Sequence, residues 1–319
     1  MSHPERLATA FVATFAVIVV GAAVVGFVAT DGTAPAPSME NEHFTDEELI
    51  NDRTPGDADV SMSAVEPPKT ILVDTGAAGG PFGAPGVTER HIRPLSNVLI
   101  ANGHEVSVYS PDGPGTLGTE LSDADAFVTF RSDYSEADLE EIESFADDGN
   151  AVVSMTDPDE EFGLSGNVAL DAHLGVSTEP GYVYNLEDHD LNYQRVYAEP
   201  DDDSELTEGV DRAVFPTATP VAVTGGSDVL RPSDGTQLST TRAATDQPVA
   251  VQDDNVVKIG TTGFLTPENA QRADNDVLIG NLADMLVTTE GVPQPPIAEP
   301  PTEDPSTNGD ADDEADAET

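Results

Sequence analysis

The sequence predicts an α/β domain with a doubly wound, mostly parallel sheet. Short apolar runs that fit buried strands, among them residues 71–73, 105–109 and 126–130, alternate with segments whose apolar residues have helical spacing. The runs are almost continuously apolar, as is typical of parallel strands that helices cover on both faces. Gly103 and Gly149 follow the helical segments, and we expect them to end the helices.

The first strand ends at Asp74 and leads through a glycine-rich stretch, residues 76–86, into a helix expected over 88–102. Pro94 is expected to perturb this helix, because proline lacks the amide donor that a helix interior needs. A second helix is expected to begin at Ser135, with Asp138 three residues later as in a capping box.

The remaining pattern is less regular. A fourth strand is expected over 151–155, but residues 158–247 show only a short helical pattern and isolated strand patterns, so their topology is not predicted. Order returns with strands over 249–251 and 256–260 and a closing helix over 276–286.

The charge of the chain is extreme. Its 319 residues hold 61 Asp and Glu against 12 Lys and Arg, for a net charge of -49. Self-repulsion of this size strains a folded chain at low ionic strength, whereas molar salt shortens the Debye length to about 3 Å. The composition therefore indicates a salt-adapted protein from a halophile. It excludes nucleic acid as a partner, since no segment provides a basic face.

Cysteine is absent from the chain. The fold therefore has no disulfide bonds, no thiolate metal ligand and no cysteine nucleophile.

Residues 7–28 form an uncharged run of 22 residues, which as a helix would extend about 33 Å and cross a bilayer core. A cleaved signal peptide is the alternative, but the apolar region of such a peptide is usually shorter. Arg6 precedes the run and no Lys or Arg follows it before Arg53, so we expect residues 1–6 in the cytoplasm and the bulk outside the cell. The prediction is a single-pass membrane protein that contacts lipid through this helix.

Three further parts are expected. Residues 29–66 combine proline with acidic residues and predict a disordered tether, residues 67–290 form the α/β domain, and residues 291–319 form a disordered, acidic, proline-rich tail.

Three segments together resemble a family of uncharacterised haloarchaeal membrane-anchored domains: residues 71–74 with the following helix and strand, residues 206–210, and residues 260–269 followed by 273–275. That family is similar to the class I glutamine amidotransferase-like fold and to the auxiliary domain of gliding-motility-type ABC transporters. The resemblance implies an amidotransferase-like fold, a membrane context and a transporter or other membrane protein as candidate partner. The family's acidic turn residue is replaced here by Thr261-Thr262-Gly263, which puts a role for that turn in doubt.

Amidotransferase chemistry is excluded, because it needs an exposed cysteine nucleophile. The nearest serine alternative, residues 163–167, lacks the second glycine of a nucleophile elbow. The glycine-rich stretch 76–86 matches neither dinucleotide-binding nor P-loop spacing, so it predicts a flexible surface loop and no nucleotide cofactor.

Metal sites are not expected either. Residues 187–190 are the densest cluster of metal-capable side chains, but adjacent residues in a loop cannot all point inward, so a solvated loop is the preferred interpretation.

Ligands of open parallel sheets bind beyond the carboxyl ends of the strands. In this chain those ends predict a ligand site formed by Asp74, Gly76, Arg131, Ser132 and Asp157. The alternative is an ion pair of Arg131 with Asp74 or Asp157 that only holds loops together.

Three hypotheses of function remain open. The first is a non-catalytic extracytoplasmic domain that binds or scaffolds, with an auxiliary role to a transporter as one option. The second is a hydrolase that uses carboxylates such as Asp74 and Asp157, with or without a divalent ion. The third is a structural envelope protein.

Overall fold

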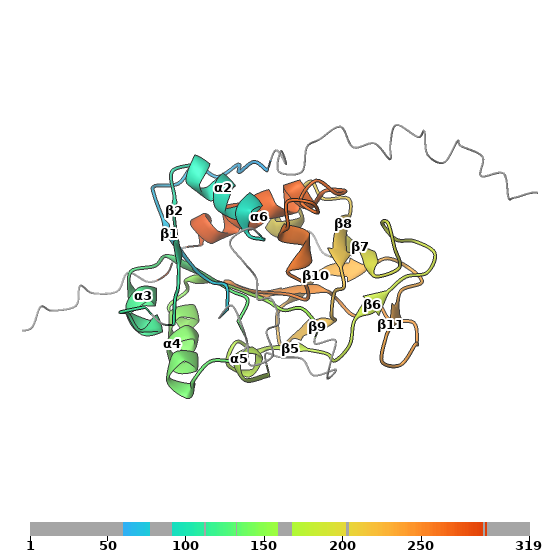
Figure 1. Cartoon of the computed structure of the whole chain (residues 1–319), viewed down its shortest axis with the longest axis horizontal. Coiled ribbons are helices and arrows are strands. Elements are labelled where there is room, and N and C mark those ends of the chain that lie inside the picture. The colour runs from blue at the N-terminus through green and yellow to red at the C-terminus, as the bar shows by residue number, and fades with distance from the viewer. Residues whose placement is uncertain are drawn as a thin grey trace, which may run out of the picture. The chain divides into compact units, whose positions relative to one another are not determined.

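The computed structural model describes residues 60–76, 91–111, 113–131, 133–158, 168–201, 204–289 and 291. Its centre is a nine-stranded sheet with the order β2-β1-β3-β4-β13-β12-β10-β7-β8 (Figure 1). The strands of one half are β1 (Thr70–Asp74), β2 (Glu105–Val108), β3 (Ala126–Thr129), β4 (Ala151–Met155) and β13 (Val256–Ile259). The strands of the other half are β7 (Arg195–Pro200), β8 (Ala213–Pro216), β10 (Ser227–Pro232) and β12 (Ala250–Asp253).

The prediction of a doubly wound, mostly parallel sheet is wrong, because this sheet is mixed. The pairings from β2 to β13 are parallel, whereas all pairings from β13 through β12, β10 and β7 to β8 are antiparallel. The reversal begins at a hairpin in which only Asp254 and Asn255 separate β12 from β13. A two-residue connection can join only antiparallel strands, and Asp254 has the positive φ of 46° that such turns use.

Two small sheets complete the strands. One pairs β6 (Val183–Tyr184) with β11 (Gln237–Leu238), and the other pairs β5 (Val176–Thr178) with β9 (Val221–Val223).

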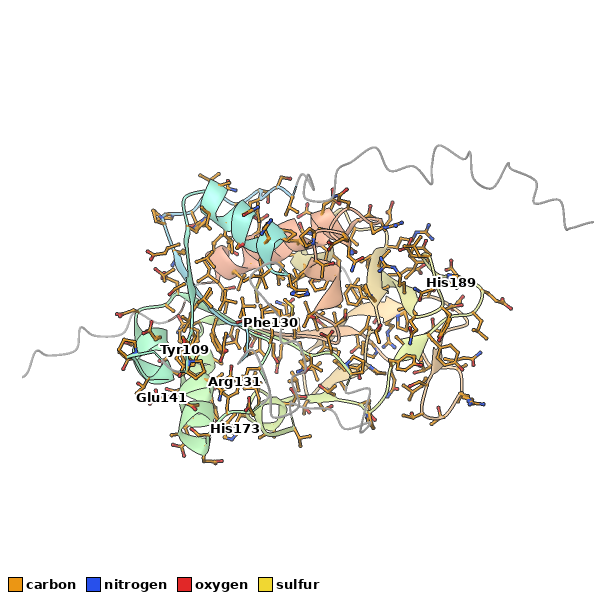
Figure 2. All side chains as sticks on the ribbon, in the orientation of Figure 1. Tyr109, Phe130, Arg131, Glu141, His173 and His189 are labelled. Atoms are coloured by element: carbon orange, nitrogen blue, oxygen red, sulfur yellow. The ribbon has the colours of Figure 1, made fainter. Side chains whose placement is uncertain are left out.

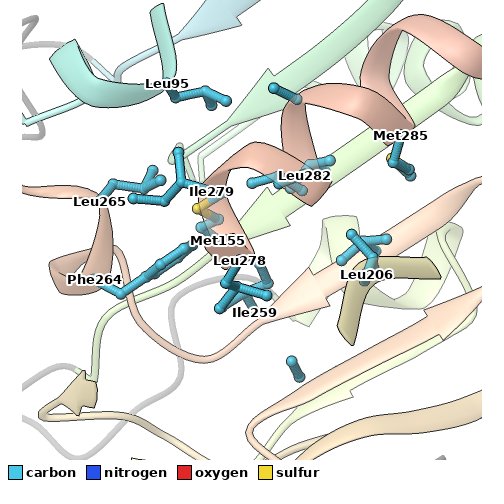
Figure 3. Close-up of a cluster of buried hydrophobic side chains, with 14 of the residues drawn as sticks. Leu95, Met155, Leu206, Ile259, Phe264, Leu265, Leu278, Ile279, Leu282 and Met285 are labelled. Atoms are coloured by element: carbon cyan, nitrogen blue, oxygen red, sulfur yellow. The ribbon is translucent and has the colours of Figure 1, made fainter. Parts of the chain in front are cut away.

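Helices cover both faces of the parallel half (Figure 1). On one face lie α2 (Arg93–Ala101) and α6 (Asn275–Thr288); on the other lie α3 (Leu117–Ser122), α4 (Glu136–Asp147) and α5 (Val168–His173). Side chains alternate between the two cores, so Ile71 and Val73 join the α2/α6 core while Leu72 joins the other. Figure 3 shows the α6 side of the first core, where this helix packs on the two 3₁₀ turns η2 (Glu205–Thr207) and η3 (Gly263–Leu265).

The start of α4 confirms the predicted capping box. The Ser135 hydroxyl accepts a hydrogen bond from the Asp138 amide, and the Asp138 carboxylate accepts one from the Ser135 amide. Pro94, in contrast, does not perturb its helix. It lies in the first turn of α2, where no intrahelical amide donor is needed.

The membrane anchor is not supported by the structure. In the part of the chain that the structure describes, no helix combines the length and the apolar character needed to cross a membrane. The predicted span 7–28 lies outside the described residues, as do residues 1–6 and the tail beyond residue 291. The structure thus conflicts with the predicted single-pass anchor and with the extracellular location that depends on it.

The end of the predicted tether is packed on the domain. Residues 60–64, called here the docked segment, contact the α2/α6 core through Val60, Met62 and Ala64. The Asp284 carboxylate on α6 accepts hydrogen bonds from the amides of Ser63 (2.9 and 3.0 Å) and Ala64 (2.9 Å), and from the Ser63 hydroxyl (2.6 Å). A side chain at Gly280 would lie 2.2 Å from the Ser61 carbonyl oxygen, so this helix position needs glycine.

Candidate functional site

A row of polar side chains crosses the parallel half of the sheet near the carboxyl ends of its strands. Strand register pairs Asp74 of β1 with Thr129 of β3, Thr129 with Ser154 of β4, and Ser154 with Lys258 of β13. We call these four residues the polar row. All four are completely buried, and they continue the face whose preceding positions carry apolar residues of the α3/α4/α5 core: Leu72, Phe127, Val152 and Val256.

Asp74 ends the row on the β1 side, and both of its carboxylate oxygens are occupied. Oδ1 accepts a hydrogen bond from the Gly76 amide (3.0 Å), and Oδ2 accepts one from the Tyr134 hydroxyl (2.8 Å). The Tyr134 and Thr129 hydroxyls lie 2.5 Å apart. Asp74 thus joins the loops that follow β1 and β3.

Arg131 lies beside this carboxylate. Its Nη1 is 3.8 Å from Asp74 Oδ2, its Nε donates to Asp133 Oδ1 (3.0 Å), and its guanidinium lies 4.8 Å from the centre of the Tyr134 ring. The Arg131 side chain is 15% exposed, whereas that of Asp133 is 86% exposed. Arg131 and Tyr109 lie on the same side of the molecule in Figure 2.

Burial dominates the acid–base behaviour of this corner. It raises the pKa of Asp74 although the Gly76 amide, Tyr134 and Arg131 all favour the carboxylate. Burial, followed by the charge of Asp74, raises the pKa of Tyr134 well above its usual value, so this hydroxyl remains a donor.

Lys258 is the cationic end of the row. Its Nζ donates to Asp171 Oδ1 of α5 (2.7 Å) and to the Ser154 hydroxyl (3.1 Å), and Asp171 Oδ2 accepts from the Thr178 hydroxyl (2.6 Å). Burial lowers the pKa of Lys258, while Asp171 opposes the shift. Sequence reasoning missed this pair. The available signal was one of only two lysines in the chain inside an apolar strand pattern, Val256-Val257-Lys258-Ile259.

Asp157 lies in a different set of contacts from the other predicted site residues. Its carboxylate accepts hydrogen bonds from the Thr262 amide (2.8 Å), the Thr262 hydroxyl (2.5 Å) and the Thr261 hydroxyl (3.4 Å). The turn after β13 therefore fixes this carboxylate. The structure brings together Asp74, Gly76 and Arg131 from the predicted site, and Ser132 lies outside the described residues.

One residue of the acidic cluster at 187–190, Asp190, forms ion pairs within the protein. Asp190 pairs with Arg195 and Arg272 at 2.9 and 3.2 Å. Among the residues that the structure describes, no group of three or more His, Cys, Asp or Glu side chains is placed to hold a metal ion.

No family model matches the sequence, and no curated protein matches it. Several solved structures resemble this chain. The structure titled "mmIFT52 N-terminal domain" has a TM-score of 0.51 at 11% identity and covers 67% of this chain and 100% of its own. A putative ThuA-like protein from Bacteroides uniformis has a TM-score of 0.46 at 13% identity, over 71% of this chain and 94% of its own.

A β-galactosidase from Bacillus circulans sp. alkalophilus has a TM-score of 0.42 at 10% identity, over 69% of this chain but 31% of its own. At 11% identity, the similarity to the mmIFT52 N-terminal domain is a similarity of fold alone. The resemblance to the haloarchaeal family stays a prediction.

Proposed function

We propose that the chain is a non-catalytic binding or scaffolding domain whose ligand site lies around Arg131, at the carboxyl ends of the parallel strands. The supporting observation is that the charged groups of the polar row already have partners within the protein. Asp74 is bonded to Gly76 and Tyr134, and Lys258 is bonded to Asp171 and Ser154. A nucleophile or general base needs a lone pair directed at its substrate, so this arrangement favours holding a ligand over reacting with it.

Arg131 supplies the exchangeable contact of the site. Its shortest ion pair is with Asp133, whose side chain is largely in solvent, and such surface pairs contribute little free energy. Its other carboxylate neighbour, Asp74, is 3.8 Å away, and both of its oxygens already accept hydrogen bonds from Gly76 and Tyr134, so it competes less for the guanidinium. A ligand or partner segment that carries a carboxylate or phosphate can therefore replace Asp133 on Arg131.

Calorimetric titration of the full chain with citrate, in about 2 M KCl to keep it folded, tests this proposal. Arg131→Ala is expected to lose citrate binding. The matched control is Lys69→Ala, which removes a cation that pairs with Asp125 at the opposite end of β1 and should leave binding unchanged.

Turnover separates this function from hydrolysis. The full chain is expected to release no nitrophenol from p-nitrophenyl acetate or p-nitrophenyl phosphate above the buffer rate. Hydrolysis that disappears in Asp74→Asn would overturn the non-catalytic function.

A further inference from the structure

The loop between β6 and β7 exposes apolar side chains on an otherwise acidic chain. The structure describes seven exposed large apolar side chains, and three of them, Leu186, Leu191 and Tyr193, lie within eight residues of each other in sequence. Their exposed fractions are 62%, 63% and 45%. Residues 185–195 are called here the 185–195 loop. His189, within this loop, lies at the opposite end of the view from Arg131 (Figure 2).

A buried asparagine fixes the first part of this loop. The Asn185 side chain is 1% exposed, and its Nδ2 donates to the Asp234 carbonyl (3.0 Å) and to two buried hydroxyls, those of Ser233 and Thr236. Its Oδ1 accepts hydrogen bonds from the backbone amides of Glu187 (3.0 Å) and Asp188 (2.9 Å). The Asn185 amide donates to the Tyr193 carbonyl (2.8 Å) and closes the loop.

Two arginines fix the second part. Asp190 accepts from Arg195 Nε (2.9 Å) and Arg272 Nη1 (3.2 Å), and Arg195 Nη2 donates to Asn269 Oδ1 (2.6 Å). The chain has only 12 Lys and Arg residues, and two of them hold this loop. A loop that is already ordered loses little conformational entropy when a partner binds.

Leu191 is the central residue of a tight turn, in which the Asn192 amide donates to the Asp190 carbonyl. Its φ is +33°, in the left-handed region that glycine and asparagine tolerate and leucine rarely adopts. Its side chain is mostly in solvent, so packing does not compensate for the strain. The turn therefore keeps an apolar side chain in solvent in an unfavourable backbone conformation.

Tyr193 is oriented by two other tyrosines. Its ring meets that of Tyr184 edge-on with centres 6.2 Å apart, and Tyr184 meets Tyr182 in the same way at 6.4 Å. A tyrosine held in place with an exposed edge is a common anchor of protein interfaces.

We propose that the 185–195 loop is a docking surface for a basic, amphipathic segment of another protein. Leu186 is followed by Glu187 and Asp188, which are exposed and form no ion pair with a described cation. These carboxylates suit Lys or Arg beside apolar partner residues. A twofold contact with a second copy would place these same carboxylates against like charges at contact distance, where salt screens least, so charge complementarity selects a basic partner. This surface is distinct from the site at Arg131 and does not depend on it.

The test uses a labelled synthetic peptide of leucines and lysines with amphipathic helical spacing, titrated into the full chain in about 2 M KCl and followed by fluorescence anisotropy. Combining Leu186→Ser, Leu191→Asn and Tyr193→Ser changes no charge and should weaken binding roughly tenfold or more. The control is Ile100→Ser with Val168→Ser, which removes apolar side chains of similar exposure elsewhere and should leave binding unchanged.

Equal binding by the wild type and the triple variant would overturn the proposal. It would mean that the peptide binds the acidic surface of the whole chain and not the apolar side chains of this loop. Sedimentation that shows dimers of the wild type but monomers of the triple variant would also overturn it, by making a second copy the occupant. Leu191→Asn alone should weaken binding while the melting temperature stays unchanged or rises. A lower melting temperature would show that Leu191 serves the fold and contradict the proposal.

Discussion

The ammonium of Lys258 lies 2.7 Å from Asp171 Oδ1, and the two side chains are 0% and 4% exposed. Removal of one partner leaves the other charge buried and unpaired. Lys258→Met is therefore expected to lower the free energy of unfolding by about 3–5 kcal/mol, measured by urea titration in molar KCl. The double variant Lys258→Met with Asp171→Leu should recover most of this loss.

Lys69→Met is the control for this pair, because Lys69 and Asp125 are partly exposed and their pair is worth at most about 1 kcal/mol. A Lys258→Met variant no less stable than Lys69→Met would contradict the account of the buried pair.

Asp74 predicts a pH dependence. Burial raises the pKa of Asp74 above 3.8, the ordinary value of an aspartate. The protonated Asp74 therefore contributes stability that is fully present below pH 3.8 and is lost as the pH rises through the folded-state pKa. Asp74→Asn removes the cost of the buried charge, so its melting temperature relative to the wild type should be highest at neutral pH. The advantage should shrink as the pH falls and Asp74 gains its proton. An advantage that grows on acidification would show that the sign of the shift is wrong.

The docked segment depends on Gly280. Gly280→Ala would gain about 1 kcal/mol in an isolated helix, but its methyl group would meet the Ser61 carbonyl oxygen. We expect the amides of Ser63 and Ala64 to exchange hydrogen faster in this variant, measured by mass spectrometry. Asp284→Asn weakens the same contact without the clash and should give a smaller increase. Unchanged protection in both variants would show that the contact with α6 does not hold the segment.

The net charge predicts salt dependence. Below roughly 0.5 M salt the Debye length exceeds 4 Å and repulsion between the acidic groups grows. Circular dichroism of the full chain over a KCl series should show loss of folded structure in this range. The same melting temperature at about 0.1 M and 2 M would rule out this dependence.

Local features of the fold could be predicted from the sequence, whereas the pairing of distant segments could not. The runs at 71–73, 126–130 and 151–155 predict strands because each is short and continuously apolar, and all three contribute to the parallel half. The mixed sheet was missed although Asp254-Asn255 between two apolar runs is a hairpin signal.

The site was predicted only in part for the same reason. Asp74 ends β1 and Arg131 follows the end of β3, and because these strands are adjacent in the sheet the rule for carboxyl ends brings them together. Asp157, in contrast, is bonded to Thr262, 105 residues further along the chain. Lys258 joins the polar row only through the register of β13 with β4, which the sequence pattern does not determine.

The competition between Asp133 and a ligand for Arg131 is the central claim about function. It is tested most directly by citrate titration of three proteins: the wild type, Asp133→Asn and Arg131→Ala. Removal of the competing carboxylate in Asp133→Asn should tighten citrate binding by up to about fivefold, because an exposed ion pair is worth at most about 1 kcal/mol, and Arg131→Ala should abolish it. Citrate affinity that is unchanged in Asp133→Asn, or retained in Arg131→Ala, would contradict a binding site at this arginine.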